Sequence, residues 1–263
     1  MSYTTLQFER DGSVAIIRLN RPDAANSLNT AMSEELVKIA THCDSNPEIR
    51  AVVLTANGKM FCAGGDLHAF AAQGDKMAEY IRYTTTGLHA AIARFARMNA
   101  PYIVAVNGMA AGAGFSIAIT GDLVLAAESA KFTEAYTRAG VSPDGSSTFF
   151  LPRLVGHVRA MQLILMNDVL TARQALEWGL VNEVVPDDKL QSRALEIAHQ
   201  LAAGPTLAFG ETKRLIADSL SNSLETQMEL ETRAIAGLAR HSEDARNAIV
   251  AFTKKQKAEF KGR

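Results

Sequence analysis

Cysteine is scarce in this 263-residue sequence, which contains only Cys43 and Cys62. The two lie far apart and lack the spacing of metal ligands, so both a disulfide scaffold and a zinc site are disfavoured. We interpret them as small buried hydrophobic residues in a protein of a reducing compartment, which indicates the cytoplasm. We expect no metal site.

Long apolar runs are missing as well. No segment reaches the ~18 uninterrupted apolar residues of a membrane span, and the opening residues, MSYTTLQFERDG, lack the basic region and apolar run of a secretory signal. Neither sign of charge is in excess, since 27 basic residues balance 28 acidic ones. We therefore expect neither nucleic acid nor a membrane as a partner, and any acidic ligand must be bound locally.

The sequence does have a large apolar fraction, 48%, which is enough to build a substantial core. Pro205 marks a boundary in the pattern. It divides the chain into a core over residues 1–204 and a C-terminal helical region over residues 205–263.

Local signals at the start of the chain predict strands and a helix. Residues 5–20 alternate in hydrophobicity on either side of Asp11-Gly12, which predicts a hairpin. Asn29 is placed to cap a helix over residues 30–45. The apolar run 51–54 predicts a strand that is buried on both faces.

The pattern then alternates between helix and strand. A long amphipathic helix is predicted over residues 76–99, and strands over 102–107 and 122–128 flank a glycine-rich turn. This alternation indicates α/β layering with buried parallel strands. The C-terminal region predicts three helices, over residues 206–220, 223–240 and 242–260, with Ser242 capping the last.

Two glycine clusters end buried strands, MFCAGGDL at residues 60–67 and NGMAAGAG at residues 107–114. Each precedes a helix, where free N–H groups and a positive dipole end are available. Two backbone donors that converge on one oxygen form an oxyanion hole, which stabilises negative charge developing on a carbonyl. On these residues alone a second interpretation stays open: an ordinary turn capped by Asp66, and small residues at 110–114 that allow tight packing.

Five motifs occur in order: RPDAANSLN (21–29), FCAGGDL (61–67), AVNGMAAGAG (105–114), GVSPDGSSTFFLPRLVG (140–156) and ALEWGLVNEVV (175–185). Together they resemble the crotonase superfamily, also called the enoyl-CoA hydratase/isomerase family. The resemblance implies an α/β fold, a spiral of ββα turns, with C-terminal helices that assemble a homotrimer or a hexamer of two trimers. It also implies an acyl-CoA substrate and no cofactor beyond the coenzyme A of that substrate.

The resemblance assigns the oxyanion donors to the N–H groups of Gly65 and Ala113. Similar hydratases carry two glutamates, at positions that hold Ser116 and Tyr136 here. Neither side chain is a good base near neutral pH, so ordinary hydration is disfavoured. A third family position, which carries the chemistry in related isomerases and aryl-CoA dehalogenases, holds Asp144.

A single carboxylate near an enolisable thioester suits a 1,3-proton shift, which needs no water. We therefore expect an isomerase that moves a double bond in enoyl-CoA or rearranges a ring-epoxidised aryl group, as in the phenylacetate branch that residues 142–156 and 223–263 resemble. An enoyl-CoA hydratase and a non-catalytic acyl-CoA-binding protein are alternatives. Asp144 could also cap the helix that residues 145–147 open, and the two roles can coexist.

His89 matches the histidine that similar dehalogenases use to activate water against an enzyme ester, which would make Asp144 a nucleophile. The aromatic side chains near that chemistry are absent, since Leu88 and Tyr136 occupy the matching positions. An aryl-CoA dehalogenase is therefore disfavoured and stays an alternative. Glu134 is a secondary candidate base, which would point the same way as Tyr136 if the segment were extended.

The resemblance also assigns residues to coenzyme A binding. Asp66 is expected to brace the loop or to contact the ligand, and the others would hold the nucleotide or its neighbourhood. Lys255 lies beside Lys254 and Lys257, and the three could equally form a solvated helix face. The matched residues are Ala24, Ala25, Asn26, Ala63, Asp66 and Leu67, with Phe252 and Lys255 of the last helix reaching the coenzyme A of a neighbouring subunit.

Overall fold

The computed structural model describes residues 3–263 and has two sheets. In the larger sheet the strands lie in the order β1-β2-β3-β5-β7-β10. β1 and β2 form the predicted antiparallel hairpin, and the remaining neighbours pair in parallel. These strands are β1 (Leu6–Asp11), β2 (Val14–Leu19), β3 (Ala51–Ala56), β5 (Tyr102–Val106), β7 (Leu123–Ala127) and β10 (Glu183–Val185).

The smaller sheet has the order β4-β6-β8-β9. Each of the pairs β3/β4, β5/β6 and β7/β8 is consecutive in the chain and contributes one strand to each sheet. This repetition is the spiral of ββα turns that the resemblance implies. The strands are β4 (Met60–Cys62), β6 (Met109–Ala111), β8 (Lys131–Thr133) and β9 (Leu170–Thr171).

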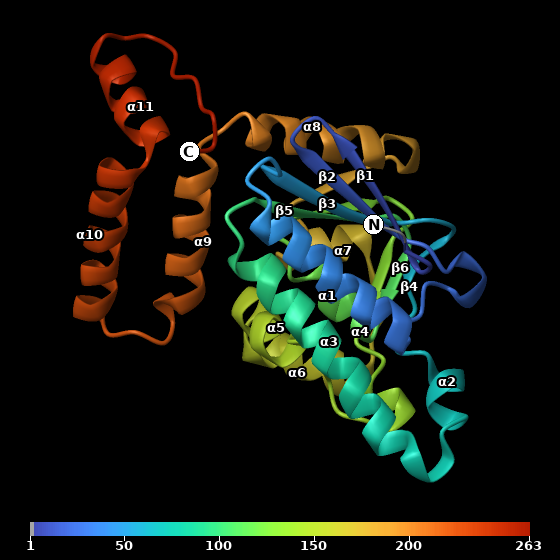
Figure 1. Ribbon diagram of the computed structural model, residues 1–263. Coiled ribbons are helices and arrows are strands. Elements are labelled where there is room, and N and C mark those ends of the chain that lie inside the picture. Colours follow the sequence, from blue (N-terminus) through green and yellow to red (C-terminus); the bar gives the residue numbers. More distant parts are fainter. Residues whose placement is uncertain (1–2) are drawn as a thin grey trace.

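Helices cover both faces of the larger sheet (Figure 1). On one face lies α8, which packs on β2, β3, β5 and β7. On the other face α1 lies beside α3, and Asn29 caps α1 as predicted, because its Oδ1 accepts the Met32 N–H. The core helices are α1 (Thr30–Ser45), α2 (Leu67–Ala71), α3 (Met77–Arg97), α4 (Ala113–Ala118), α5 (Ser147–Val155), α6 (His157–Met166), α7 (Ala172–Glu177) and α8 (Leu190–Ala202).

The C-terminal region forms the three predicted helices, α9 (Thr206–Ser219), α10 (Leu224–His241) and α11 (Glu243–Thr253), at one side of the core (Figure 1). The prediction of a last helix to residue 260 is wrong, since α11 ends at Thr253. The reason is tertiary: the buried Asp244 carboxylate accepts the N–H groups of Lys261 and Gly262, and this draws the tail back along α11. The division of the chain into two units at Pro205 stays a prediction.

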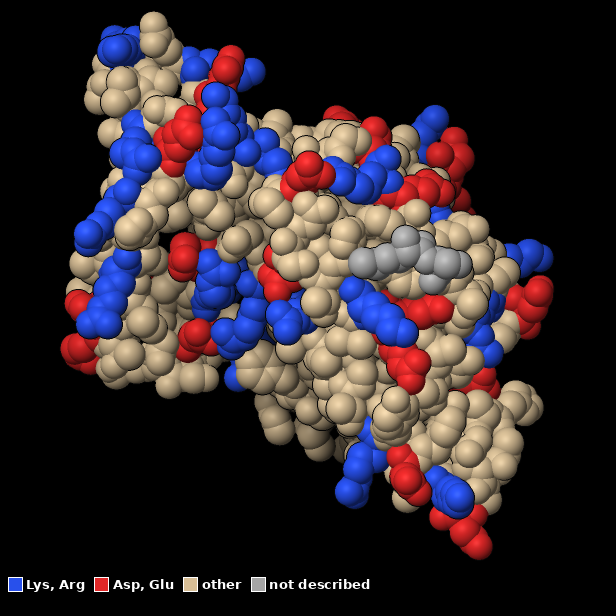
Figure 2. Space-filling view, viewed as in Figure 1, with Lys and Arg blue, Asp and Glu red and all other residues tan. Residues whose placement is uncertain are grey.

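The residues that the structure describes include no helix with the length and apolar character needed to cross a bilayer. Acidic and basic side chains are interspersed over the face in Figure 2. Neither sign dominates that face, in agreement with the balanced composition.

A partly buried ion pair joins α9 to the core. Lys213 Nζ lies 2.7 Å from Asp122 Oδ2, and it also donates to the carbonyl oxygens of Phe95 and Ala100. Asp122 accepts the Tyr102 N–H as well. All four contacts link segments that are distant in the sequence, so this ammonium group fixes the first C-terminal helix against the end of α3.

Lys213→Met should lower the free energy of unfolding by about 1–2 kcal/mol, because it leaves the partly exposed Asp122 carboxylate without its cation and two carbonyl oxygens without their donor. Denaturant unfolding followed by circular dichroism measures this loss. Lys189→Met removes an exposed lysine that pairs with its neighbour Asp188, and should change the stability by less than about 0.5 kcal/mol. Equal losses in the two variants would contradict the interpretation.

Candidate active site

Three strands of the smaller sheet end at one edge. β4 pairs in parallel with β6, and β6 pairs in parallel with β8. Because parallel strands share a direction, the residues that follow them meet at the same edge, where α/β proteins commonly bind ligands. The segments 63–66, 112–113 and 134–136 are therefore brought together, although they lie far apart in the sequence.

The two glycine clusters touch one another at this edge. Gly64 has φ +104°, and a Cβ added there would lie 3.1 Å from Ala111 O and 3.6 Å from Ala113 N. Such a backbone angle and such an approach require glycine. Within residues 3–263, no hydrogen-bond acceptor is recorded for the N–H group of Gly65 or of Ala113. Each of the two glycine clusters, which touch one another, thus supplies one free N–H donor, as an oxyanion hole requires. The role of these two N–H groups in binding a thioester oxygen stays a prediction.

Asp66 braces the first glycine loop. Its Oδ1 accepts the Ala69 N–H and caps α2, as expected, and its Oδ2 lies 3.0 Å from Arg21 Nη2. Arg21 Nη1 also donates to Ser27 O. Burial acts to raise the pKa of Asp66, but the Ala69 bond and Arg21 outweigh it and the pKa lies below its ordinary value. The carboxylate is therefore ionised and engaged, which makes it a poor base. Sequence reasoning missed Arg21, for which the only signal was its place in the RPDAANSLN motif.

The turn assigned to coenzyme A packs against this loop. Ala63 N–H donates to Ala25 O, and Leu28 N–H donates to Gly64 O. The Asn26 side chain is fully buried and donates to the carbonyl oxygens of Asn57 and Met60, so it holds the turn in place. Ala24 and Ala25 are half-buried, and Ala63 and Leu67 are exposed. These four remain positioned for a ligand, and coenzyme A binding by them stays a prediction.

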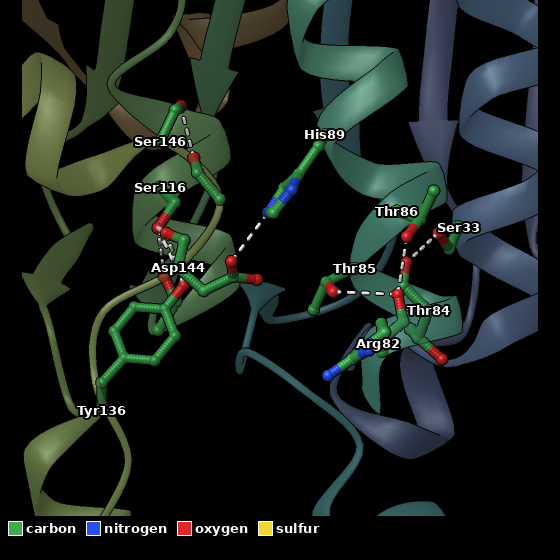
Figure 3. Close-up of polar contacts among 12 residues, drawn as sticks. Ser33, Arg82, Thr84, Thr85, Thr86, His89, Ser116, Tyr136, Asp144 and Ser146 are labelled. Carbon is green, nitrogen blue, oxygen red and sulfur yellow. Dashed lines mark hydrogen bonds and ion pairs between the residues drawn. The ribbon is translucent and has the colours of Figure 1, made fainter. Parts of the chain in front are cut away.

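Asp144 faces His89 across the site (Figure 3). His89 Nε2 lies 2.7 Å from Asp144 Oδ1, with half of the His89 side chain and about a third of the Asp144 side chain exposed. Histidine 89 projects from α3, and α3 is tied to α1 because Ser33 Oγ donates to Thr84 O. The α5 helix begins at Ser147, but Asp144 does not cap it, because its side chain is turned to His89.

Ser116 and Tyr136 hold the main chain of Asp144. Ser116 Oγ lies 2.7 Å from the Asp144 carbonyl oxygen and 2.9 Å from Tyr136 Oη, which is itself 3.0 Å from the same carbonyl. These three contacts are compatible with one another when the Ser116 hydroxyl group donates its hydrogen to the Asp144 carbonyl oxygen. Burial raises the pKa of the Tyr136 phenol, so it stays protonated and can donate. Both hydroxyl groups are committed to positioning Asp144.

Glu134 does not point the way that an extended segment would have implied. β8 ends at Thr133, Ala135 has φ +55°, and a 3-10 helix begins at Thr137. Strand alternation therefore does not continue to Tyr136. Glu134 is fully buried.

Phe252 and Lys255 lie away from the site within their own chain. Phe252 is 81% exposed near the end of α11, and α11 stands at the opposite end of the molecule from α2 (Figure 1). Lys255 follows the helix rather than lying in it, with φ +55°. Contact of these residues with a neighbouring subunit's coenzyme A stays a prediction.

Within residues 3–263, no cluster of three or more histidine, cysteine or acidic residues could hold a metal ion. Both cysteines are buried, as predicted. Burial raises the pKa of the Cys43 thiol to about 12 and that of the Cys62 thiol to about 11. Neither is a nucleophile in the folded protein, which leaves carboxylates, hydroxyl groups, His89 and backbone amides for the chemistry.

The family model described as enoyl-CoA hydratase/isomerase matches residues 9–263. The chain belongs to this family. Its fold agrees with the assignment: a solved enoyl-CoA hydratase from Polaromonas sp. JS666 superposes with a TM-score of 0.92 at 32% identity, covering 97% of this chain and 99% of that one. The crotonase superfamily and its α/β architecture are thereby confirmed.

Members of the family with different reactions are similar to the chain. A "Probable enoyl-CoA hydratase" from Rhodobacter capsulatus is 40% identical over the whole of both chains. The 1,2-epoxyphenylacetyl-CoA isomerase of Escherichia coli is 38% identical over 95% of each chain. The 4-chlorobenzoyl coenzyme A dehalogenase-2 of an Arthrobacter species is 35% identical, covering 90% of this chain and 86% of that one. Similarity therefore fixes the family but not the reaction.

Asp66→Asn keeps the cap of α2 but removes the charge that faces Arg21, so it should lower the stability at pH 7 by about 1 kcal/mol. Because the pKa of Asp66 is lowered in the folded state, the stability from the ion pair is present at neutral pH and is lost as the pH falls through that lowered value. Denaturant unfolding at several pH values measures this.

Asp23→Asn, at an exposed position of the neighbouring turn, is the matched control and should leave the stability unchanged. A deficit of Asp66→Asn that persisted in acid would show that the shape of the side chain, rather than its charge, stabilises the loop.

Proposed function

We propose that the chain is an acyl-CoA isomerase in which Asp144 moves a proton along the acyl chain. The N–H groups of Gly65 and Ala113 would bind the thioester oxygen. The observation that carries the proposal is the use of Ser116 and Tyr136: the two positions that hold glutamates in similar hydratases hold hydroxyl groups that fix the Asp144 carbonyl.

The reaction conserves every atom of the substrate. The Asp144 carboxylate takes a proton from the α carbon of a 3-enoyl-CoA, and the electron pair of the broken C–H bond moves into a dienolate. The two amides stabilise the oxygen of this dienolate, each by about 3 kcal/mol. Asp144 then returns the proton to the γ carbon, which gives the conjugated 2-enoyl-CoA. The same base and hole would serve the rearrangement of a ring-epoxidised aryl thioester.

His89 would hold the carboxylate in place between the two transfers. The 2.7 Å contact is an ion pair when the imidazole is protonated. Its half-exposed side chain can also exchange a proton with water. These features support a role for His89 in positioning Asp144.

An aryl-CoA dehalogenase is the second candidate, because the same contact places a nucleophilic carboxylate beside a histidine that could activate water. The 35% identity to a 4-chlorobenzoyl coenzyme A dehalogenase supports it. Leu88 and Tyr136 at the positions of the expected aromatic residues weigh against it. A hydratase, supported by the relatives named so, and a non-catalytic acyl-CoA-binding protein are the remaining alternatives.

We keep the homotrimer or hexamer and the cytoplasmic location as proposals. Large apolar side chains are exposed on α6 and on the three C-terminal helices, which supports burial of these surfaces in an assembly. They are Val158, Leu165 and Met166 on α6, and Ile216, Met228, Ile235 and Ile249 on α9 to α11.

Asp144→Asn should reduce the rate of double-bond migration by about 10²-fold to 10⁴-fold, because the amide cannot accept the proton. The assay gives the protein a 3-enoyl-CoA and follows the ultraviolet band of the conjugated thioester. Affinity for the acyl-CoA, measured by calorimetry, should hardly change, since the backbone contacts remain. Asp188→Asn, at an exposed position, is the control and should keep the full rate.

The same assay separates the other reactions. Addition of water to a 2-enoyl-CoA with no migration of the double bond would favour the hydratase, and release of halide from an aryl-CoA would favour the dehalogenase. Tight binding of acyl-CoA with no turnover of any thioester would favour the non-catalytic alternative.

A further inference from the structure

Glu134 is a buried carboxyl group that forms no ion pair with any residue from 3 to 263. Its side chain has no exposed surface. Oε2 lies 3.5 Å from Ser147 Oγ, and Oε1 has no hydrogen-bond partner within residues 3–263. Burying a charge without a cation or several hydrogen bonds is costly, so such a group favours its neutral form. A neutral carboxyl group still has a proton to donate and oxygens to accept with.

The groups that face Glu134 are uncharged or already paired. From α5 the facing side chain is Ser147. Gly112, in the turn before α4, lies near the main-chain carbonyl oxygen of Glu134. Tyr136 and Asp144 are the nearby titratable groups; the phenol of Tyr136 is neutral, and Asp144 is engaged by His89. Burial raises the pKa of Glu134 to about 7, and the bond from Ser147 only partly opposes this.

Ser147 connects Glu134 to the segment that carries Asp144. It is the first residue of α5, and its N–H donates to Asp144 O. Between them Gly145 and Ser146 have φ values of +61° and +69°. A non-glycine residue in that region costs about 1–2 kcal/mol, so the turn persists only when its surroundings hold it. Ser116 and Tyr136 hold the start of this turn at the Asp144 carbonyl oxygen, and Glu134 contacts its end at Ser147.

We propose that Glu134 is a positioning residue, whose neutral carboxyl group anchors Ser147 and so keeps the Asp144 carboxylate in its catalytic place. The proposal rests on the isomerase function put forward above. It replaces the expectation that Glu134 is a second base, because a fully buried side chain does not reach the substrate. It also predicts a pH dependence. The arrangement around Glu134 is most stable while its carboxyl group is neutral. This stability falls as the pH rises through the raised pKa of Glu134, because a buried charge then appears without a cation and the bond from Ser147 compensates for it only in part.

The test compares Glu134→Gln, which keeps a neutral group of the same size, with Glu134→Ala, which removes the anchor. The control Glu177→Gln lies at an exposed position on α7. Steady-state kinetics with a 3-enoyl-CoA from pH 5.5 to 9 gives kcat and KM, and the ring resonances of His89 in an NMR spectrum report whether Asp144 still lies beside it. The NMR measurement needs no turnover, so it decides the positioning even if the protein isomerises no thioester.

Glu134→Ala should lower kcat by about tenfold to a hundredfold, with KM within about twofold, and should shift the His89 resonances. Glu134→Gln should show the wild-type kcat and the wild-type His89 resonances at pH 6. When the pH is raised from 6 to 8, its kcat should fall less than that of the wild type. If Glu134→Ala does not fold, Ser147→Ala removes the same anchor and should have the same effects. Two results would overturn the proposal: Glu134→Gln as impaired at pH 6 as Glu134→Ala, or unchanged kcat and unchanged His89 resonances in Glu134→Ala.

Discussion

Parallel pairing in the smaller sheet is the constraint on which the site depends. β4, β6 and β8 run in one direction, so the residues that follow each strand emerge at a common edge. Strand pairing alone therefore places the two glycine loops next to the segment that carries Tyr136. Each turn of the spiral contributes one functional segment, and a shift of one strand along its neighbour would separate the two loops while leaving the larger sheet intact.

Different polar groups hold the main chain and the side chain of Asp144. Ser116 and Tyr136 fix the carbonyl oxygen, whereas His89 contacts the carboxylate. The position of the backbone and the direction of the side chain are thus set by groups from different elements, α4, the segment after β8, and α3. A carboxylate in the proposed proton-transfer role would need such separate supports, because an error of about 1 Å at the reacting atoms can cost about a hundredfold in rate.

Local features of the fold could be predicted from the sequence, because their signals lie within a few residues. The caps at Asn29 and Asp66 and the hairpin across Asp11-Gly12 are examples. The resemblance supplied the identity of Asp144, but its contact with His89 joins positions 55 residues apart. The burial of Glu134 and the end of α11 at Thr253 depend likewise on distant partners. Periodicity carries no information about such contacts, which arise only when the chain is packed.

The burial of the Cys43 and Cys62 thiols has a practical consequence for chemical labelling. Cys62 lies directly before the first glycine loop, and Cys43 lies in the layer between α1 and the sheet; neither is accessible in the folded chain. Alkylating reagents can reach them only through opening of the core, so the speed of their modification reports the frequency of that opening. A single cysteine introduced at the surface would, conversely, be the one site where a dye attaches under native conditions.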